Sequence, residues 1–551
     1  MKIKQLFFFL FIIGLAFTGA AQKPKTVINN TNGVQRPKLI VGMVVDQMRW
    51  DYLYRYNERY GNGGFKRLLN EGFSAENTYI PYVPTATACG HSSIYTGSVP
   101  AINGIIGNNW FDPLLKRDVY CTEDNDVISV GSTSNAGKMS PKNLLTTTIT
   151  DELRLATNFR SKVISISLKD RGSILPGGHV ANAAYWFDSS NGNWISSTHY
   201  IQQLPKWVND FNAQKLADKY FDKDWHTLYP ISTYKQSTAD DKAYEGKYKG
   251  EKAPVFPHAF KQFIGKDYEL IKSSPYGNTF TLDLAKTAIK EENLGKNEVP
   301  DFLAVSLSST DYIGHQFGPN SIEVEDTYLR LDKDLEDFFN YLDKTIGKGN
   351  YVFFLSADHG VTHAPGFTTE NKLPGGGLAI RKYKSDLDSL LLKDFNIKKG
   401  ISTLQNNQVI FDLDVIKAAH ADYVKVKQSC IDYLNKQDAV LQAVDIKNIS
   451  NATLPDEVKN RLINGYNAKR SGDIYVILNP GVYPSTSPGT GHAAWNPYDS
   501  HIPAVFMGWG VKPGKTNKRY YMTDIAPTLA ALLHIQEPSG NIGTAITELI
   551  K

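Results

Sequence analysis

Short apolar runs that end abruptly in polar residues recur along this chain. Such runs, rich in β-branched residues and without alternation, are typical of strands buried on both faces of a parallel sheet. The runs are "KLIVGMVVDQ" ending at Asp46, "SKVISISLKDR" ending at Lys169 and Arg171, "PDFLAVSLSSTD" ending at Asp311, and "YVFFLSADHG" ending at Asp358 and His359.

Amphipathic helical patterns separate these runs. "NLLTTTITDELRLATN" precedes the second run and "VEDTYLRLDKDLEDFFNYLDKTIG" precedes the fourth, both with apolar residues spaced by three and four positions. The alternation predicts an α/β fold, with a mostly parallel central sheet and helices on both of its faces. Ligands bind such sheets at the carboxyl ends of the strands, where the polar residues that end the runs lie.

Two stretches interrupt the alternation. Residues 190–270 are rich in Trp, Tyr and Lys, and residues 374–480 carry strand and helix patterns of their own. We interpret both as insertions that form a cap over the strand ends, with the core at 38–373 and 481–551. The chain is expected to return to the core through "GDIYVILNPG", "IPAVFMGWG" and the helix "TDIAPTLAALL".

The N-terminus is typical of a secretory signal peptide, residues 1–21. A basic "MKIKQ" precedes the apolar "LFFFLFIIGLAF" and the small residues "TGAAQ", which predicts cleavage near Ala20 or Ala21. The apolar run is shorter than the ~20 residues of a spanning helix. We therefore expect a monomeric periplasmic or secreted protein that is not held at a membrane after cleavage.

Composition excludes some classes of protein. The 60 basic and 56 acidic residues give a formal charge of +4, which does not indicate nucleic acid or a membrane surface as a partner. Three cysteines, Cys89, Cys121 and Cys430, are too few for a disulfide scaffold.

Residues with metal-ligand character gather at the predicted strand ends. Asp311 and His315 have a spacing that puts both on one face of a helical turn. A single Asp at a strand end can equally cap a helix. As a set, however, the residues suit two metal ions with three protein ligands each. Carboxylates and imidazoles without thiolates favour zinc, although manganese or iron would accept similar ligands. The candidate ligands are Asp46, Asp311, His315, Asp358, His359 and His492.

The stretch "PTATACGHSS", residues 84–93, predicts a turn that leads into a helix. A threonine at its start would lie in the field of a helix N-terminus, which favours anions. Such a threonine could be an N-cap, or it could be a nucleophile activated by a metal ion. The residues alone leave both roles open.

Five motifs together resemble the alkaline phosphatase superfamily. "VVDQMRWDYL", "PTATACGH", "STDYIGHQFGP", "SADHG" and "GTGH" follow its order and approximate spacing from residue 38 to the end, outside the insertions. They are most similar to the secreted bacterial two-zinc enzymes with a threonine nucleophile, which are related to nucleotide pyrophosphatase/phosphodiesterases.

The resemblance implies a role for each candidate residue. Thr87 would be the nucleophile and a zinc ligand, and Cys89 would depart from the small residue or proline expected there. The sulfatase pattern C-x-P-x-R does not follow Cys89. One zinc ion would be held by Asp311, His315 and His492, and the other by Asp46, Asp358 and His359.

The choice between phosphate monoesters and diesters depends on further donors. A monoester carries about two negative charges and needs cations beyond the metals. Lys169 and Arg171 alternate at a predicted strand end, so both should point the same way toward the phosphate. Asn108, or its neighbour Asn109, could add a hydrogen bond. The threonine-type monoesterases have Asn, Lys and Arg at matching positions, whereas the diesterase relatives lack the K-x-R.

The sequence therefore predicts an exported alkaline phosphatase with two Zn²⁺ ions. It would hydrolyse small phosphate monoesters through a phosphothreonine and release inorganic phosphate. A phosphodiesterase or nucleotide pyrophosphatase on the same bimetal core is the alternative, and an inactive exported zinc-binding protein is a second. A metal-dependent phosphoglycerate mutase is disfavoured because that enzyme is cytoplasmic.

Overall fold

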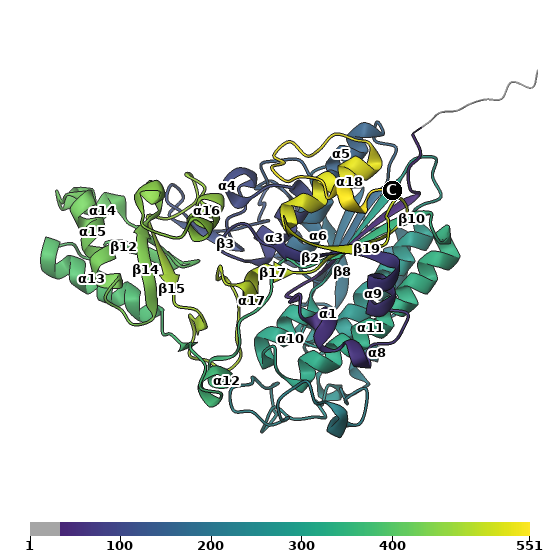
Figure 1. Ribbon diagram of the computed structural model, residues 1–551, viewed down its shortest axis with the longest axis horizontal. Helices are drawn as coiled ribbons and strands as arrows, with labels where there is room; N and C mark the ends of the chain where they lie inside the picture. Colours follow the sequence, from purple (N-terminus) through teal and green to yellow (C-terminus); the bar gives the residue numbers. More distant parts are fainter. Residues whose placement is uncertain (1–33) are drawn as a thin grey trace, which may run out of the picture. The chain divides into compact units, whose positions relative to one another are not determined.

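A central eleven-stranded sheet organises the computed structural model, which describes residues 34–551 (Figure 1). The predicted signal peptide lies outside the described residues. The strand order is β17-β2-β18-β10-β1-β9-β6-β7-β8-β5, and β19 pairs with β2. Four of its strands are the runs that the hydrophobic pattern predicts: β1 (Leu39–Val45), β6 (Val163–Ser167), β9 (Asp301–Leu307) and β10 (Tyr351–Ser356).

The middle of the sheet is parallel, and antiparallel pairs flank it on both sides. Strands β10, β1, β9, β6 and β7 run parallel to one another, whereas β18 is antiparallel to β10 and β8 is antiparallel to β7. The prediction of a mostly parallel sheet is therefore right for the centre only, because the whole sheet is mixed. The four residues between β7 and β8 are too few for a parallel crossover, so they form a hairpin. The other strands of the sheet are β2 (Gly72–Tyr79), β5 (Ser129–Val130), β7 (Ala183–Asp188), β8 (Asn193–Ser197), β17 (His501–Ile502), β18 (Ala504–Gly508) and β19 (Gly514–Tyr521).

Helices cover both faces of this sheet, as predicted (Figure 1). The helices α3, α5, α6 and α18 pack together on one face, and α9, α10 and α11 pack together on the other. Both helices expected from the amphipathic patterns are present, as is the helix near the C-terminus. The bounds are α3 (Thr87–Thr96), α5 (Ile149–Ala156), α6 (Asp170–Gly177), α9 (Tyr276–Glu291), α10 (Ser309–Phe317), α11 (Ile322–Leu342) and α18 (Ile525–Leu533). No helix within residues 34–551 is long and apolar enough to cross a membrane.

The second predicted insertion contains a separate four-stranded sheet, in the order β12-β13-β15-β14. Its apolar core includes Leu387, Val426 and Val476. The run "GDIYVILNPG" forms β15 here, so the prediction that it returns to the central sheet is wrong. An apolar run does not by itself specify which sheet pairs with it. The elements are α13 (Arg381–Phe395), β12 (Ile401–Gln405), β13 (Gln408–Phe411), α14 (Leu413–Ala418), α15 (Tyr423–Leu434), β14 (Val440–Asp445), α16 (Asp456–Gly465) and β15 (Ile474–Leu478).

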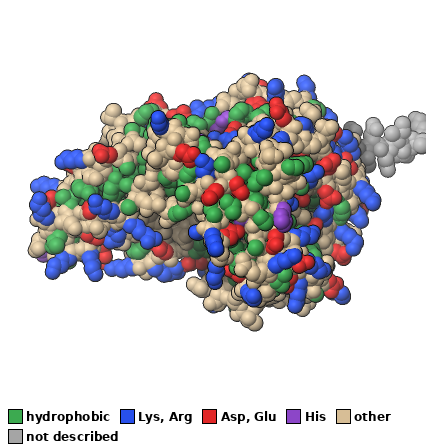
Figure 2. Space-filling view, turned by 90° about the horizontal axis from the view of Figure 1, so that it is seen from below, with side chains coloured by type: hydrophobic (Ala, Val, Ile, Leu, Met, Phe, Trp, Pro, Cys, Tyr) green, Lys and Arg blue, Asp and Glu red, His purple; other side chains and the backbone are tan. Residues whose placement is uncertain are grey.

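Hydrogen bonds join this second sheet and its helices to the core near the start of α3. Asn464 Nδ2 donates to Pro81 O at 2.8 Å, and Arg470 Nη1 donates to Asn143 O at 2.9 Å. The outer surface around α13–α15 carries many Lys side chains, which Figure 2 shows gathered at that end. Such charged side chains keep the outer surface solvated.

The first predicted insertion is only partly separate from the central sheet. Its early residues form β8, which pairs with β7. After β8 the segment contains the short helices α7 (Lys206–Ala213) and α8 (Leu216–Phe221) and long irregular stretches. Trp225 anchors these stretches to α11, since its Nε1 donates to Asp326 Oδ2 at 2.7 Å.

A buried histidine in this segment is expected to make stability depend on pH. His258 Nδ1 lies 2.8 Å from Glu251 Oε1, and Nε2 lies 3.3 Å from Glu323 Oε1. Burial alone would lower the pKa of His258, but the two carboxylates outweigh it and raise the pKa to about 9. Because the folded pKa exceeds the unfolded value, the stabilisation is complete below about pH 6.5 and is lost as the pH rises through 9.

At pH 6, the free energy of unfolding of His258→Gln should therefore be about 1–3 kcal/mol smaller than that of the wild type, so the variant should unfold at a lower temperature. The deficit should shrink by pH 9.5, as measured by thermal unfolding at both values. His226→Gln, which changes an exposed histidine of the same segment, is the control and should leave both curves unchanged. An equal deficit for His258→Gln at pH 6 and 9.5 would contradict the assignment.

Candidate two-metal active site

Three neighbouring strands deliver carboxylates to one edge of the central sheet. Asp46 follows β1, Asp311 follows β9, and Asp358 follows β10. Because β1 pairs with both β9 and β10 in parallel, the ends of all three strands lie side by side. The three carboxylates therefore lie together at the carboxyl ends of the strands, where a ligand site was expected.

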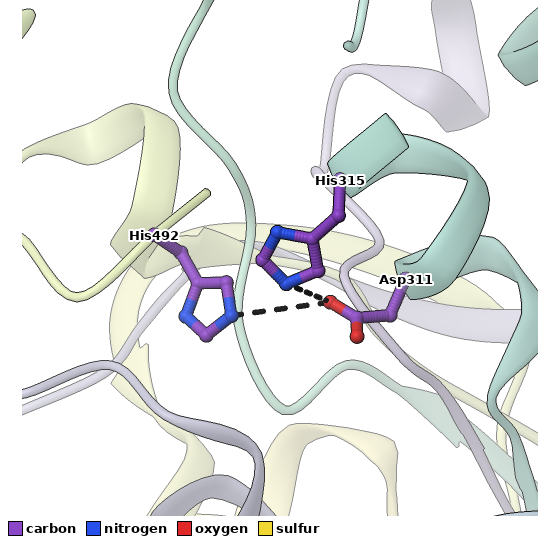
Figure 3. Close-up of side chains that lie close together, drawn as sticks. All are labelled: Asp311, His315 and His492. Atoms are coloured by element: carbon purple, nitrogen blue, oxygen red, sulfur yellow. Dashed lines mark ion pairs between the residues drawn. The ribbon is translucent and has the colours of Figure 1, made fainter. Parts of the chain in front are cut away.

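Asp311, His315 and His492 form the first group (Figure 3). His315 lies one turn after Asp311 in α10, and its Nε2 is 3.1 Å from Asp311 Oδ1. His492 arrives on the loop between β16 (Val482–Tyr483) and α17 (Pro497–Ser500), and its Nε2 is 3.9 Å from the same oxygen. One ligand atom from each residue lies within 4.8 Å of the others, so one ion could contact all three.

Asp46, Asp358 and His359 form the second group, and all three are fully buried. His359 Nε2 lies 3.6 Å from Asp46 Oδ1 and 3.4 Å from Asp358 Oδ2. These two carboxylate oxygens have no hydrogen-bond partner among residues 34–551. Burial and the neighbouring Asp46 raise the pKa of Asp358 well above its usual value. Unpartnered carboxylate oxygens that face one imidazole nitrogen fit a bound cation.

The three histidines all use Nδ1 for a backbone carbonyl. His315 pairs with Thr490 O at 2.7 Å, His359 pairs with Gly360 O at 2.9 Å, and His492 pairs with Thr85 O. A proton on Nδ1 leaves the lone pair on Nε2, which is the atom that faces the carboxylates in each group. This tautomer is the one that binds a metal ion through Nε2. The donor set of nitrogen and carboxylate oxygen fits zinc.

Thr87 begins α3 beside the second group. Its Oγ1 lies 3.4 Å from His359 Nε2. The N-cap of α3 is Ala86, and the helix has no side-chain cap, so the alternative of Thr87 as an N-cap is wrong. Gly90 allows the close approach of α3, because a Cβ there would lie 2.4 Å from Asp358 Cβ.

Asn108 lies at the same helix terminus. Its Oδ1 accepts a hydrogen bond from Ala88 N at 2.9 Å, which leaves Nδ2 available as a donor. Asn109 begins β3 (Asn109–Asp112) and is exposed. Of the two adjacent asparagines, only Asn108 contacts the start of α3.

Lys169 and Arg171 do not alternate along a strand, so that prediction is wrong. β6 ends at Ser167, Lys169 precedes α6, and Arg171 lies in its first turn. The chain turns early because Lys169 N donates to Ser167 Oγ at 3.2 Å. Both residues nevertheless line one pocket of about 360 Å³, together with Tyr120 and Tyr312.

The two basic side chains have different partners. Lys169 Nζ lies 2.7 Å from Asp46 Oδ2 and 2.5 Å from Asp311 Oδ2, so it bridges the two groups. Arg171 Nη1 donates to Tyr120 Oη at 3.0 Å. The Nε of Arg171 is buried and has no partner among the described residues, which leaves a donor free for an anion.

The structure adds three residues that the sequence did not single out. His91 is fully buried, with Nδ1 2.9 Å from Thr87 O and Nε2 2.7 Å from Ser306 Oγ. Burial lowers the pKa of His91 to about 4. Tyr120 Oη accepts a hydrogen bond from Arg171 and donates one to Asp170 Oδ1 at 2.8 Å. Gln47 contacts both metal-ligand groups. Gln47 and His91 lie inside motifs already noted, but their side-chain partners are distant in sequence, so no local pattern marks them.

Comparisons with known proteins give a consistent result. The family model "Type I phosphodiesterase / nucleotide pyrophosphatase" matches residues 40–502. Alkaline phosphatase PhoV of Synechococcus elongatus is 69% identical over the full length of both chains. A calcium-transporting ATPase of Myroides odoratus is 56% identical over 94% of this chain and 95% of that protein.

Alkaline phosphatase PafA of Elizabethkingia meningoseptica is 52% identical over 94% of this chain and 96% of its own. Its crystal structure superposes with a TM-score of 0.93 at 51% identity, covering 94% of this chain and all of that chain. A PafA mutant changed at a threonine, an asparagine, a lysine and an arginine superposes with a TM-score of 0.92 at 50% identity over the same shares.

Proposed function

Because this chain belongs to the type I phosphodiesterase/nucleotide pyrophosphatase family, we propose that it is an alkaline phosphatase, an enzyme that hydrolyses phosphate monoesters. The relatives PhoV and PafA, named as alkaline phosphatases, support this activity. The observation that carries the proposal is Thr87 Oγ1, which lies beside the second ligand group. Asn108 lies at the start of the same helix, and Lys169 contacts Asp46 and Asp311, one carboxylate from each group. The PafA mutant is altered at the same four residue types in the same order along the chain.

Two zinc ions per chain are proposed for the two groups of ligands. Asp311, His315 and His492 would hold one ion, and Asp46, Asp358 and His359 would hold the other, with Thr87 Oγ1 next to it. When bound, the ions supply positive charge that stabilises the transferred phosphoryl group and the leaving oxygen.

The side chains of this protein would then carry out the transfer. Thr87 Oγ1 forms a bond to phosphorus while the bond from phosphorus to the leaving oxygen breaks, and the alcohol departs with the proton that Thr87 gives up. Arg171 and Asn108 donate to the non-bridging oxygens throughout, and Lys169 adds its charge. Water then cleaves the phosphothreonine, which restores the Thr87 hydroxyl and releases inorganic phosphate.

The proposed location follows from the predicted signal peptide. We propose that the mature protein is exported to the periplasm or beyond the cell and acts as a monomer. Small-molecule phosphate monoesters would be its substrates, without nucleic acid as a partner. Detection of the mature protein outside the cytoplasm, cut near Ala20 or Ala21, would test this location.

One kinetic comparison tests the proposed activity. An aryl phosphate monoester and its methyl diester share a leaving group, so their kcat/KM values on the zinc-loaded enzyme can be compared directly. We expect the monoester to be preferred by several orders of magnitude. A preference for the diester would instead favour the phosphodiesterase alternative, and no turnover of either substrate would favour an inactive zinc-binding protein.

Arg171→Ala should lower kcat/KM for the monoester by about 10²–10³-fold, because one charged donor to the phosphoryl oxygens is lost. The diester carries one negative charge fewer on its non-bridging oxygens, so kcat/KM for the diester should fall by less than about 10-fold. Arg117→Ala, at an exposed arginine that pairs with Glu123, is the control and should change neither value. Equal losses for both substrates in Arg171→Ala would count against the proposed role of Arg171.

A further inference from the structure

Gln47 connects the two groups of proposed zinc ligands through two separate hydrogen bonds. Its backbone N–H donates to Asp358 Oδ1 at 3.0 Å. Its side-chain Nε2 donates to Asp311 Oδ1 at 2.6 Å. The residue is only 2% exposed, so neither bond competes with bulk water.

The backbone at Gln47 adopts a conformation that is unusual for its residue type. Its φ of +65° lies in the left-handed region, which is sterically unfavourable for residues other than glycine. The chain enters this conformation directly after Asp46, itself a proposed ligand. The strained turn directs the N–H of Gln47 at Asp358 and its side chain at Asp311.

The facing helix is shaped around the Gln47 amide. A Cβ on Gly314 of α10 would lie 1.9 Å from Gln47 Oε1, so only glycine fits at that position with the amide in place. Gly314 stands between Asp311 and His315, the two ligands that α10 supplies. The amide therefore packs against the turn that carries two of the three ligands of the first group.

We propose that Gln47 is a positioning residue that orients Asp311 and Asp358 for the two metal ions and so links the two sites. The proposal rests on the proposed two-zinc function. Carboxylates that bind metal ions are themselves held by hydrogen bonds, and loss of such a partner typically weakens metal binding about 10–100-fold. Among the described residues Gln47 makes no hydrogen bond to Thr87, so its role would be exerted through the ligands.

The two hydrogen bonds make the effect selective for one site. Any substitution with a backbone N–H keeps the bond to Asp358, but only an amide side chain keeps the bond to Asp311. Replacing the side chain should therefore lower the zinc affinity of the site formed by Asp311, His315 and His492 about 10–100-fold. The zinc affinity of the site formed by Asp46, Asp358 and His359 should change by less than about threefold.

Two variants separate the hydrogen bond from simple packing. Gln47→Met keeps the length of the side chain without the amide, whereas Gln47→Gly removes the side chain and relaxes the positive φ. If the amide is what matters, both variants should lose zinc affinity at the same site and to a similar degree. If packing is what matters, Gln47→Gly should be much worse than Gln47→Met, and that result would overturn the proposal.

Zinc binding, and not activity, is the measurement. Chelator-stripped wild type and variants would be titrated with zinc against a chromophoric competitor. The occupancy of each site would be read from anomalous diffraction of crystals grown at limiting zinc. Gln408→Met is a matched control, because Gln408 is also buried and its Oε1 accepts from Gly472 N at 2.6 Å in the second sheet. This control should leave both zinc affinities at their wild-type values.

The outcomes distinguish this inference from the proposed function. A wild type that binds fewer than two zinc ions at these groups would remove the proposed function, and the inference with it. A wild type that binds two ions, with variants that bind both equally tightly, would overturn only the role of Gln47. Equal weakening of both sites would also overturn it, since the backbone bond to Asp358 is retained.

Discussion

Replacing Thr87 with alanine is expected to lower kcat for phosphate monoesters by on the order of 10⁴-fold and to abolish the phosphoenzyme. Thr87 Oγ1 is the hydroxyl that lies 3.4 Å from His359 Nε2, at the N-terminus of a fully buried helix. Without that oxygen no bond to phosphorus can form, although the metal ligands and the phosphate donors remain. The measurement is steady-state turnover together with mass spectrometry of acid-quenched enzyme.

Two control variants make the Thr87 result specific. Thr87→Ser keeps a hydroxyl at the same position and should retain substantial activity and a phosphoenzyme. Thr96→Ala removes a buried threonine at the other end of α3, whose Oγ1 donates to Ser92 O at 2.7 Å, and should affect stability more than turnover. A Thr87→Ala enzyme with wild-type turnover and a phosphorylated residue would rule out Thr87 as the nucleophile.

The grouping of the candidate ligands could be predicted from the sequence because their carboxylates follow predicted strands. Asp46, Asp311 and Asp358 each follow an apolar run, and the carboxyl ends of adjacent parallel strands must meet. The exact strand order was not needed, since any arrangement that places these strands together brings the carboxylates together. The helical spacing of Asp311 and His315 likewise determines their shared face before any tertiary contact is known.

The remaining features depend on contacts between distant segments. The antiparallel pairs that flank the parallel middle, and the position of β15, depend on pairing partners that an apolar run does not specify. Lys169 was expected at a strand end, but it is one of only two residues between the end of β6 and the start of α6. Gln47 was missed because its hydrogen-bond partners, Asp311 and Asp358, are 264 and 311 residues away in the sequence.

Removal of the metal ions should abolish activity and lower the melting temperature by several degrees. Asp46, Asp311 and Asp358 are all buried, and Asp46 and Asp358 both face His359 Nε2. A bound ion present at about 1,000 times its dissociation constant adds about 4 kcal/mol of stability per site, which chelation removes. Dialysis against a chelator, followed by thermal unfolding and an activity assay with and without added zinc, measures both effects. Full activity after complete chelation would contradict the two-metal assignment.

Lys169 allows the stability effect to be assigned to these carboxylates. Its Nζ contacts Asp46 and Asp311, so it offsets part of their charge when no metal ion is bound. When zinc is bound, the ions also offset that charge, and loss of Lys169 should matter less. Lys169→Met should therefore lower the melting temperature of the chelated protein more than that of the zinc-loaded protein. Breaking a buried ion pair costs about 3–5 kcal/mol when nothing else compensates the charge, so the difference should be measurable. Equal decreases in the melting temperatures of the chelated and zinc-loaded protein would show that the ions and Lys169 do not act on the same buried charges.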